Sequence, residues 1–388
     1  MCSVDVSVGN EFFLLLNFCY LCTSSILFIM KLLTKVLSFI LFFSLPLFLS
    51  AQESTSYKFT NKGLVRTSVA ADSSVSKLNV LKPILIFKGK YEMDTDNGDS
   101  QFAVKYARVG VQGDVAKFLS YKFMVDLSDN GSFKVLDLYT VFKPVKGLKL
   151  TFGQGAIPLF NSYTVSPNAV DFVNRPFIGK YFNSSRDIGL TAYYTIKQKG
   201  FPIALEAGLY NGDGINNPKW TNTFAYSARV LFGSMNGFRA TAKFYKTNIS
   251  STEDYLIWGA DFRYDNKLMR LEAEFMNKFN YHTPEGYPGE LSAMYAQGLV
   301  KIPVSSKVFT RIEPALRWDA MGYDIEDRGL GVNRGTVGVN FVLNTAPFNS
   351  VLRINYDHYF NNSMDMSKIF KTEYYNDNKV ALEFLLVF

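Results

Sequence analysis

Residues 255–278 read YLIWGADFRYDNKLMRLEAEFMNK, and this stretch decides the fold class. On both sides of Asp265-Asn266, apolar side chains occupy every second position and charged side chains occupy positions between them. A period of two residues is that of a β-strand, whose successive side chains point to opposite faces. The stretch therefore predicts two antiparallel strands joined by a tight turn, with one apolar face and one charged face.

The same alternation continues along the chain, in residues 308–319, 351–358 and 379–388. Aromatic residues make up 16% of the sequence, yet after about residue 50 no apolar run approaches the ~20 residues of a membrane-spanning helix. Many segments are near the roughly 9–11 residues that a tilted membrane-spanning strand requires. A soluble sheet also alternates, but the number and length of these segments favour a membrane barrel.

The links between the segments alternate in length. Short links such as 114–116 and 265–266 follow one set of strands, and longer links such as 154–185 and 360–377 follow the other. Short periplasmic turns and longer extracellular loops are typical of outer-membrane barrels. The sequence therefore predicts an all-β protein, a transmembrane antiparallel β-barrel of about 16 strands in contact with outer-membrane lipid.

The N-terminal residues predict export. Met30 to Lys35 is a short basic start, Val36 to Leu49 is apolar, and Ala51 is a small residue before Gln52. This is the pattern of a Sec signal peptide at 30–51. We interpret residues 1–29 as an extension upstream of the true start, 52–78 as a flexible periplasmic tail and 79–388 as the barrel. A second apolar block, Phe12 to Ile29, precedes this signal peptide. The alternative is that the two apolar blocks form a helical hairpin in the inner membrane.

Composition excludes several functions. The three cysteines, Cys2, Cys19 and Cys22, all precede the expected mature start, and only two histidines, His282 and His358, occur. No nucleophile, metal-binding or phosphate-binding motif is present. We therefore expect no enzyme activity, no metal and no cofactor. The net charge is +7 without a compact Lys/Arg cluster, so we expect no nucleic-acid partner.

The last strand predicts a partner in assembly. Residues 379–388 read KVALEFLLVF, and every second residue from Val380 to Phe388 is apolar. A terminal aromatic residue on such a strand is similar to the signal recognised by the barrel-assembly machinery. Phe388 is therefore the candidate assembly signal.

Four stretches resemble the phosphate-selective porin O/P family of bacterial outer-membrane porins. They are YARVGVQGD at 106–114, LKLTFGQGAIP at 148–158, NRP at 174–176 with RDIGL at 186–190, and GTVGVNF at 335–341 with RINY at 353–356. The resemblance implies a sixteen-stranded, often trimeric channel that passes anions. Members selective for phosphate present a Lys/Arg ladder in the lumen, whereas here the signs mix, with Arg270 near Glu272 and Arg311 near Glu313.

Candidate pore residues fall into two groups. The longest internal link, 154–185, is expected to fold inward and narrow the pore, with an outward-facing loop as the alternative. From that link and its end we select Asp171, Arg175, Lys180 and Arg186. An Arg on the lipid face would cost about 2–4 kcal/mol near the midplane, so strand arginines are expected in the lumen, either binding anions or pairing with carboxylates of neighbouring strands. They are Arg108, Arg263, Arg270, Arg311, Arg317 and Arg353.

Three functions remain open from the sequence. The first is passive diffusion of small anionic or general solutes, with a modest preference for anions that extends to phosphate. The second is a structural or adhesin barrel with little conductance, and the third is a barrel enzyme. Conductance in planar bilayers separates the first from the second, and a hydrolysis screen tests the third.

Overall fold

A computed structural model describes residues 54–60, 63–69, 75–129, 132–159, 170–178, 185–197, 200–248, 254–281, 289–362 and 377–388. The predicted signal peptide, its upstream extension and Lys180 lie outside these residues. The chain forms two compact units, Met1–Tyr57 with Arg66–Lys77, and Lys58–Val65 with Leu78–Phe388. Within the segment expected as a tail, β1 (Ser54–Thr60) and β2 (Gly63–Val69) are strands that pair with each other.

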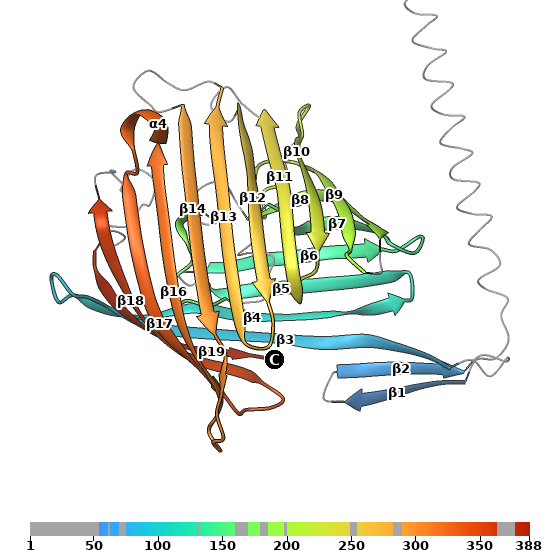
Figure 1. Ribbon diagram of the computed structural model, residues 1–388. Coiled ribbons are helices and arrows are strands. Elements are labelled where there is room, and N and C mark those ends of the chain that lie inside the picture. The colour runs from blue at the N-terminus through green and yellow to red at the C-terminus, as the bar shows by residue number, and fades with distance from the viewer. Residues whose placement is uncertain are drawn as a thin grey trace, which may run out of the picture. The chain divides into compact units, whose positions relative to one another are not determined.

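Sixteen long strands build the second unit (Figure 1). They are β3 (Val75–Asp94), β4 (Ser100–Ala116), β5 (Leu119–Asp129), β6 (Ser132–Phe142), β7 (Leu148–Ala156), β8 (Arg186–Lys197), β9 (Ile203–Tyr210), β10 (Ala225–Gly233), β11 (Gly237–Asn248), β12 (Asp254–Asp265), β13 (Met269–Asn280), β14 (Glu290–Val300), β16 (Phe309–Tyr323), β17 (Val332–Leu343), β18 (Asn349–Asn362) and β19 (Lys379–Val387). A two-residue strand, β15 (Ile302–Pro303), pairs with β16, and a short helix, α4 (Ile325–Arg328), follows β16. Among the described residues, no helix has the length and hydropathy needed to cross a membrane.

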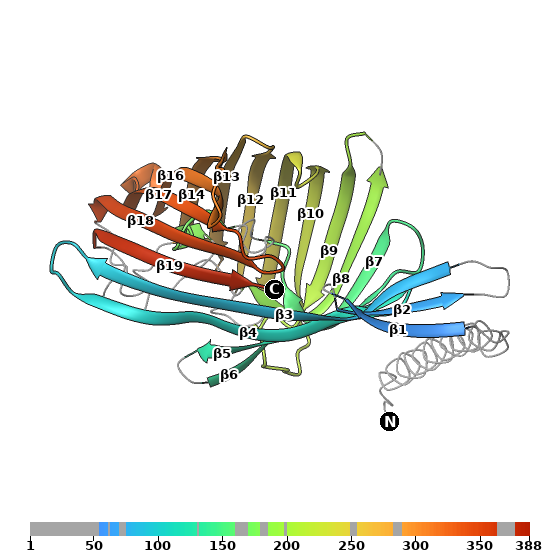
Figure 2. The same ribbon diagram turned by 90° about the horizontal axis from the view of Figure 1, so that it is seen from below.

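The sheet closes on itself. Each long strand pairs antiparallel with the next one along the chain, and β19 returns to pair with β3 from Lys379↔Asp94 to Val387↔Ile86. Figure 2 shows β19 beside β3 at this seam. The terminal Phe388 extends the pairing, because its N–H donates to the Leu85 carbonyl at 2.9 Å. The predicted closed barrel of sixteen antiparallel strands is thus confirmed.

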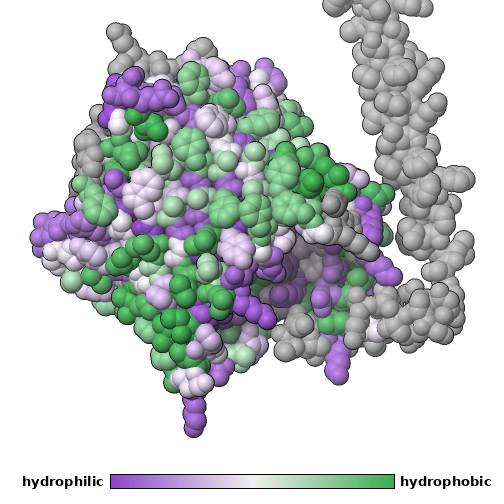
Figure 3. Space-filling model, in the orientation of Figure 1, coloured by the Kyte–Doolittle hydropathy of each residue, from purple (hydrophilic) through white to green (hydrophobic). Residues whose placement is uncertain are grey.

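The two faces of the strands differ in polarity and exposure, as the alternation predicted. In β12, Trp258 is 48% exposed, whereas Asp261 and Arg263 on the opposite face are 4% and 2% exposed. In β19, Leu382 and Phe384 are exposed on the outside, whereas Glu383 between them is buried. Figure 3 shows hydrophobic side chains spread over the outer surface of the strands that face the viewer. Apolar side chains therefore cover the outside of the barrel, and most of its charged side chains point inward.

Links of different lengths leave the two rims. The residues 157–185 between β7 and β8 and 363–378 between β18 and β19 are long, whereas β12 and β13 are joined by 266–268 alone. Successive strands are antiparallel, so β7 and β18, the fifth and fifteenth strands of the barrel, end at the same rim. The link between β5 and β6 is only 130–131.

Candidate functional site: the barrel lumen

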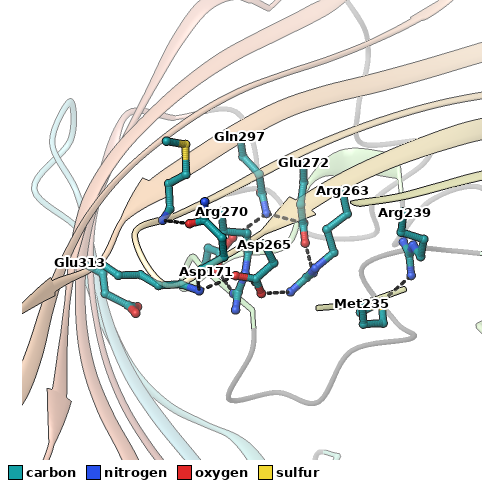
Figure 4. Close-up of polar contacts among 12 residues, drawn as sticks. Asp171, Met235, Arg239, Arg263, Asp265, Arg270, Glu272, Gln297 and Glu313 are labelled. Carbon is teal, nitrogen blue, oxygen red and sulfur yellow. Dashed lines mark hydrogen bonds and ion pairs between the residues drawn. The ribbon is translucent and has the colours of Figure 1, made fainter. Parts of the chain in front are cut away.

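A segment of the longest link lies against the inner wall of the barrel. The carboxylate of Asp171 accepts hydrogen bonds from Arg270 Nη1 of β13 at 2.5 Å and from Gln297 Nε2 of β14 at 3.0 Å (Figure 4). Its backbone carbonyl accepts another from Asn340 Nδ2 of β17 at 2.9 Å. Arg270 and Gln297 also contact neighbouring wall carboxylates, so Asp171 joins a network that spans several strands. We call residues 171–178 the inserted segment.

Backbone groups of the inserted segment are bound by charged side chains of the wall. Lys88 Nζ of β3 donates to the Val173 carbonyl at 2.7 Å, and Arg317 Nη1 of β16 donates to the Asn174 carbonyl at 2.7 Å. In the opposite sense, the Phe177 N–H donates to Asp319 Oδ2 at 3.1 Å. Buried backbone groups need such partners, because an unpaired one loses the free energy of its hydrogen bonds to water. The wall charges thereby hold the chain inside the barrel.

Apolar packing adds to these polar contacts. Ile157 and Leu159, which begin the long link, and Phe177 and Ile178 are nearly inaccessible to solvent. They belong to one cluster with inward-facing side chains of β10 to β17, among them Ile257 and Met276. Burying each such side chain contributes about 1.5–3 kcal/mol. Both ends of the described part of the link are therefore fixed in the lumen.

The strand arginines selected from the sequence all lie on the inward face, and each pairs with a carboxylate. Arg263 pairs with Glu272, and Arg270 pairs with Asp171 and with Asp265 rather than with its sequence neighbour Glu272. The remaining pairs of this group are Arg108–Asp126 (2.8 Å), Arg311–Glu313 (2.5 Å), Arg317–Asp319 (3.5 Å) and Arg353–Glu383. Arg186, which was selected with the long link, pairs with Asp137 at 2.9 Å. Arg108, Arg263 and Arg353 pair with carboxylates of neighbouring strands, as in one of the two expected alternatives, whereas Arg311 and Arg317 pair within β16.

Arg175 differs from the strand arginines because it belongs to the inserted segment. Its carbonyl accepts a hydrogen bond from Arg334 Nη2 at 3.2 Å, and its side chain hydrogen-bonds to Tyr106 of β4. Tyr106 also lies beneath the Arg108 guanidinium, 3.7 Å from the ring centroid. Arg175 is therefore oriented toward the β3–β4 wall.

Cations outnumber carboxylates in two of these clusters. Asp137 lies between Lys122 (2.7 Å) and Arg186 (2.9 Å), and Glu383 is shared by Lys88 and Arg353. Elsewhere charges balance more closely. Lys243, for example, contacts both Asp261 and Glu274, and Arg334 contacts both Asp319 and Asp357. At Asp137 and at Glu383, therefore, the wall places two cations beside one carboxylate.

Several wall residues that hold the inserted segment were not selected from the sequence. They are Lys88, Gln297, Asp319, Arg334, Asn340 and Asn355. Their inward-facing positions follow from the two-residue period, which was the available signal. Their contacts depend on where the link between β7 and β8 enters the barrel, which the period does not give.

The wall formed by β6 to β9 is hollowed. A cavity of about 310 Å³ opens there, and we call it the Tyr–Gly hollow. Its lining combines aromatic rings, hydroxyls, glycines and three charged side chains. The lining residues are Tyr139, Val141, Lys149, Thr151, Gly153, Gly155, Ala156, Asp187, Gly189, Thr191, Tyr193, Glu206 and Tyr210.

A comparison with protein families gives a match that agrees with the resemblance seen in the sequence. Residues 86–254 match the family of phosphate-selective porins O and P. This stretch is thus similar to that family. It includes the first three of the four resembling stretches.

Solved outer-membrane proteins share the fold at low identity. OmpF of Salmonella typhi is 12% identical with a TM-score of 0.58, over 86% of this chain and 100% of that one. A trimer form of OmpT of Vibrio cholerae is 14% identical with a TM-score of 0.52, over 80% and 99%. The outer-membrane channel DcaP of Acinetobacter baumannii is 15% identical with a TM-score of 0.50, over 79% and 97%. No curated protein matches the sequence.

The family match and the similar folds point to a porin barrel of the outer membrane.

Proposed function

We propose that the barrel is a passive channel for small solutes with a modest preference for anions. The observation that carries the proposal is that two wall carboxylates each contact two cations. Asp137 contacts Lys122 and Arg186, and Glu383 contacts Lys88 and Arg353. In each cluster two cations contact one carboxylate, and we take this local ratio as the source of the preference. Charges along a low-dielectric wall focus the field and raise the local concentration of the opposite ion.

The preference is modest because most arginines already have carboxylate partners. Arg263 and Arg317 are almost completely buried against Glu272 and Asp319. A paired guanidinium has fewer free donors for a passing anion and a smaller net field. The lumen therefore differs from a continuous Lys/Arg ladder, and we propose phosphate as one of several permeant anions rather than a tightly held one.

The proposal is tested by reversal potentials across planar bilayers with a KCl gradient. We expect chloride to pass more easily than potassium. The difference should shrink as the Debye length falls from about 10 Å at 0.1 M to about 3 Å at 1 M salt. A channel that selects cations at low salt would contradict the electrostatic argument, and block by micromolar phosphate would show a tighter anion site than we propose.

Matched single-charge variants locate the effect. Arg186→Gln removes one of the two cations beside Asp137, whereas Lys307→Gln removes an exposed cation from the link before β16. We expect Arg186→Gln to reduce anion preference and Lys307→Gln to leave it nearly unchanged. Arg175→Glu with Arg186→Glu should move the reversal potential toward cations. Equal effects of the two single variants would mean that overall charge, not the lumen wall, determines selectivity.

We also propose that three barrels associate in the outer membrane and that Phe388 is read by the barrel-assembly machinery. Support for the trimer comes from the similar fold of OmpT, which has a trimer form. The molar mass of the detergent-solubilised protein, measured by light scattering, tests it. A monomer at all protein concentrations would reject the trimer.

A second candidate function is a structural barrel with little conductance. It is favoured by the inserted segment, which occupies lumen space along β13 to β18. The same bilayer recordings separate the two candidates, since this second function predicts folded, inserted protein without ion current.

A further inference from the structure

The Tyr–Gly hollow is built by a regular row of residues. Across four neighbouring strands, Tyr139 of β6 pairs with Gly153 of β7, Gly153 with Gly189 of β8, and Gly189 with Tyr210 of β9. All four line the hollow. Adjacent strands lie about 4.8 Å apart, so the two tyrosine backbones are separated by roughly 14 Å, with two positions between them that carry no side chain.

The glycines make room for the rings. A Cβ on Gly155 would lie 3.0 Å from Tyr139 Cδ1, and a Cβ on Gly189 would lie 2.8 Å from Tyr210 Cδ1. Each ring therefore lies against a glycine, and a larger residue would displace it. Tyr210 is buried and its hydroxyl is 3.1 Å from Thr191 Oγ1, so it forms a fixed side of the hollow. Tyr139 is only partly buried.

A second tyrosine completes the accessible lining. Tyr193 of β8 is partly buried, and it pairs in register with Lys149 of β7 and with Glu206 of β9. Between its row and the Tyr139 row, Thr151 and Thr191 pair with each other and present hydroxyls to the same cavity. The rings of Tyr139 and Tyr193 thus line the hollow together with neutral hydrogen-bonding groups, and Lys149 Nζ lies 5.4 Å from the Tyr193 ring centroid.

The charges of the hollow do not favour an anion as its occupant. Two carboxylates, Asp187 and Glu206, face one ammonium, that of Lys149. The carboxylates have partners within the chain, because Glu206 accepts from Arg229 at 2.5 Å and Asp187 accepts from the Gly212 N–H at 2.9 Å. They are therefore held in place as acceptors at the edge of the cavity. This chemistry differs from the cation-rich clusters beside Asp137 and Glu383.

Aromatic faces beside hydroxyls and fixed acceptors match a solute with a flat C–H face and a rim of hydroxyls. We propose that the Tyr–Gly hollow is a subsite for a neutral sugar ring, a function that rests on the proposed channel. Its volume of about 310 Å³ is at the lower end of ligand pockets, which begin near 300 Å³, so one ring is the appropriate size. Tyr139 and Tyr193 are the positioning surfaces, and Thr151 and Thr191 are the neutral hydrogen-bonding partners.

The experiment records ion current through the full-length protein in planar bilayers while D-glucose is added at millimolar concentrations. Sorbitol is the comparison solute, because it carries similar hydroxyls without a rigid ring face. We expect glucose to reduce the current saturably and sorbitol to reduce it far less. Equal reduction by the two solutes would overturn the subsite, since it would reflect viscosity and excluded volume alone.

Variants locate the effect. Tyr193→Ala and Tyr139→Ala should each weaken the apparent affinity for glucose about 2- to 10-fold, the usual contribution of an aromatic contact. Tyr193→Phe keeps the ring and should retain most of the affinity, which also covers the case in which the alanine variant fails to fold. Tyr194→Ala is the matched control, because the neighbouring Tyr194 is exposed on the outer face.

An unchanged glucose affinity in Tyr193→Ala would overturn the assignment of the hollow. A folded barrel that never conducts would instead overturn the proposed channel, and the subsite with it. A conducting channel that ignores glucose would overturn the subsite alone.

Discussion

The attachment of the inserted segment to the wall is open to a direct test at Asp171. Asp171→Ala removes the acceptor for Arg270 Nη1 at 2.5 Å and for Gln297 Nε2 at 3.0 Å. Hydrogen bonds to a charged group contribute about 1.5–3 kcal/mol each, which sets an upper range of about 3–6 kcal/mol for both. Arg270 keeps Asp265 at 3.0 Å and Gln297 keeps Glu272 at 2.8 Å, so neither is left unpaired. We therefore expect the free energy that attaches the inserted segment to the wall to fall by an amount near the lower end of this range, about 3 kcal/mol.

A loss of about 3 kcal/mol raises the population of the detached state roughly 100-fold, since each 1.4 kcal/mol is a factor of ten. The backbone contacts of Val173 and Asn174 remain, so the segment should loosen first at its Asp171 end. Single-channel recordings are the appropriate assay. We expect larger current fluctuations and brief steps to higher conductance, with Asp171→Asn intermediate because it keeps an acceptor without the charge.

Arg311→Gln provides the matched control. It removes a 2.5 Å ion pair with Glu313 from the same wall without a described contact to the inserted segment. Its current should resemble that of the wild type. If Asp171→Ala shows wild-type noise and conductance, or if Arg311→Gln reproduces its fluctuations, the inserted segment does not narrow the conducting path.

Three further predictions concern processing, assembly and orientation. Peptide mapping of purified outer membranes should give a mature N-terminus at or near Gln52, and recovery of residues 1–29 would contradict the proposed start at Met30. Phe388→Asp should lower the yield of heat-modifiable barrel, because Phe388 pairs across the β3 seam and packs 5.1 Å from Phe348, ring centroid to centroid; unchanged yield would count against its role in assembly. Trp258→Arg, on the outer face near the middle of β12, should destabilise the barrel by about 2–4 kcal/mol in denaturant titrations, whereas Trp258→Leu should have a small effect, and equal effects would argue against lipid contact there.

The fold was predictable because two environments act on every strand. Apolar side chains lie on the outer face, which we propose contacts lipid, and charged side chains lie on the lumen face, so the period of two in 255–278 persists throughout the barrel. The strand count and the closed sheet follow from repeating that signal. The lengths of β3 (20 residues) and β4 (17 residues) exceed the roughly 9–11 residues of a spanning strand and did not follow, because residues beyond the apolar band lose the constraint that produces the alternation.

The partners within the lumen were harder to predict. Arg270 and Glu272 share a face of one strand, but Glu272 lies directly across from Arg263 in the register of β12 and β13. Directly opposed residues approach more closely than residues two apart on one strand, so Glu272 pairs across strands. Likewise, the alignment of Tyr139, Gly153, Gly189 and Tyr210 depends on the register of four neighbouring strands. Neither arrangement follows from a single segment.

An arginine-rich lumen is therefore compatible with weak charge selectivity. A buried guanidinium without a partner is costly, so a wall that buries Arg317 and Arg353 requires Asp319 and Glu383 beside them. A paired guanidinium still has N–H donors to spare, and Arg317 uses one of them to bind the Asn174 carbonyl of the inserted segment. We therefore propose that the arginines of this wall serve chiefly to order the lumen, and that selectivity depends on the few places where two cations contact one carboxylate. Reversal potentials of Lys122→Gln and Arg186→Gln should accordingly change more than that of Arg317→Lys, even though Arg317 is the more buried residue.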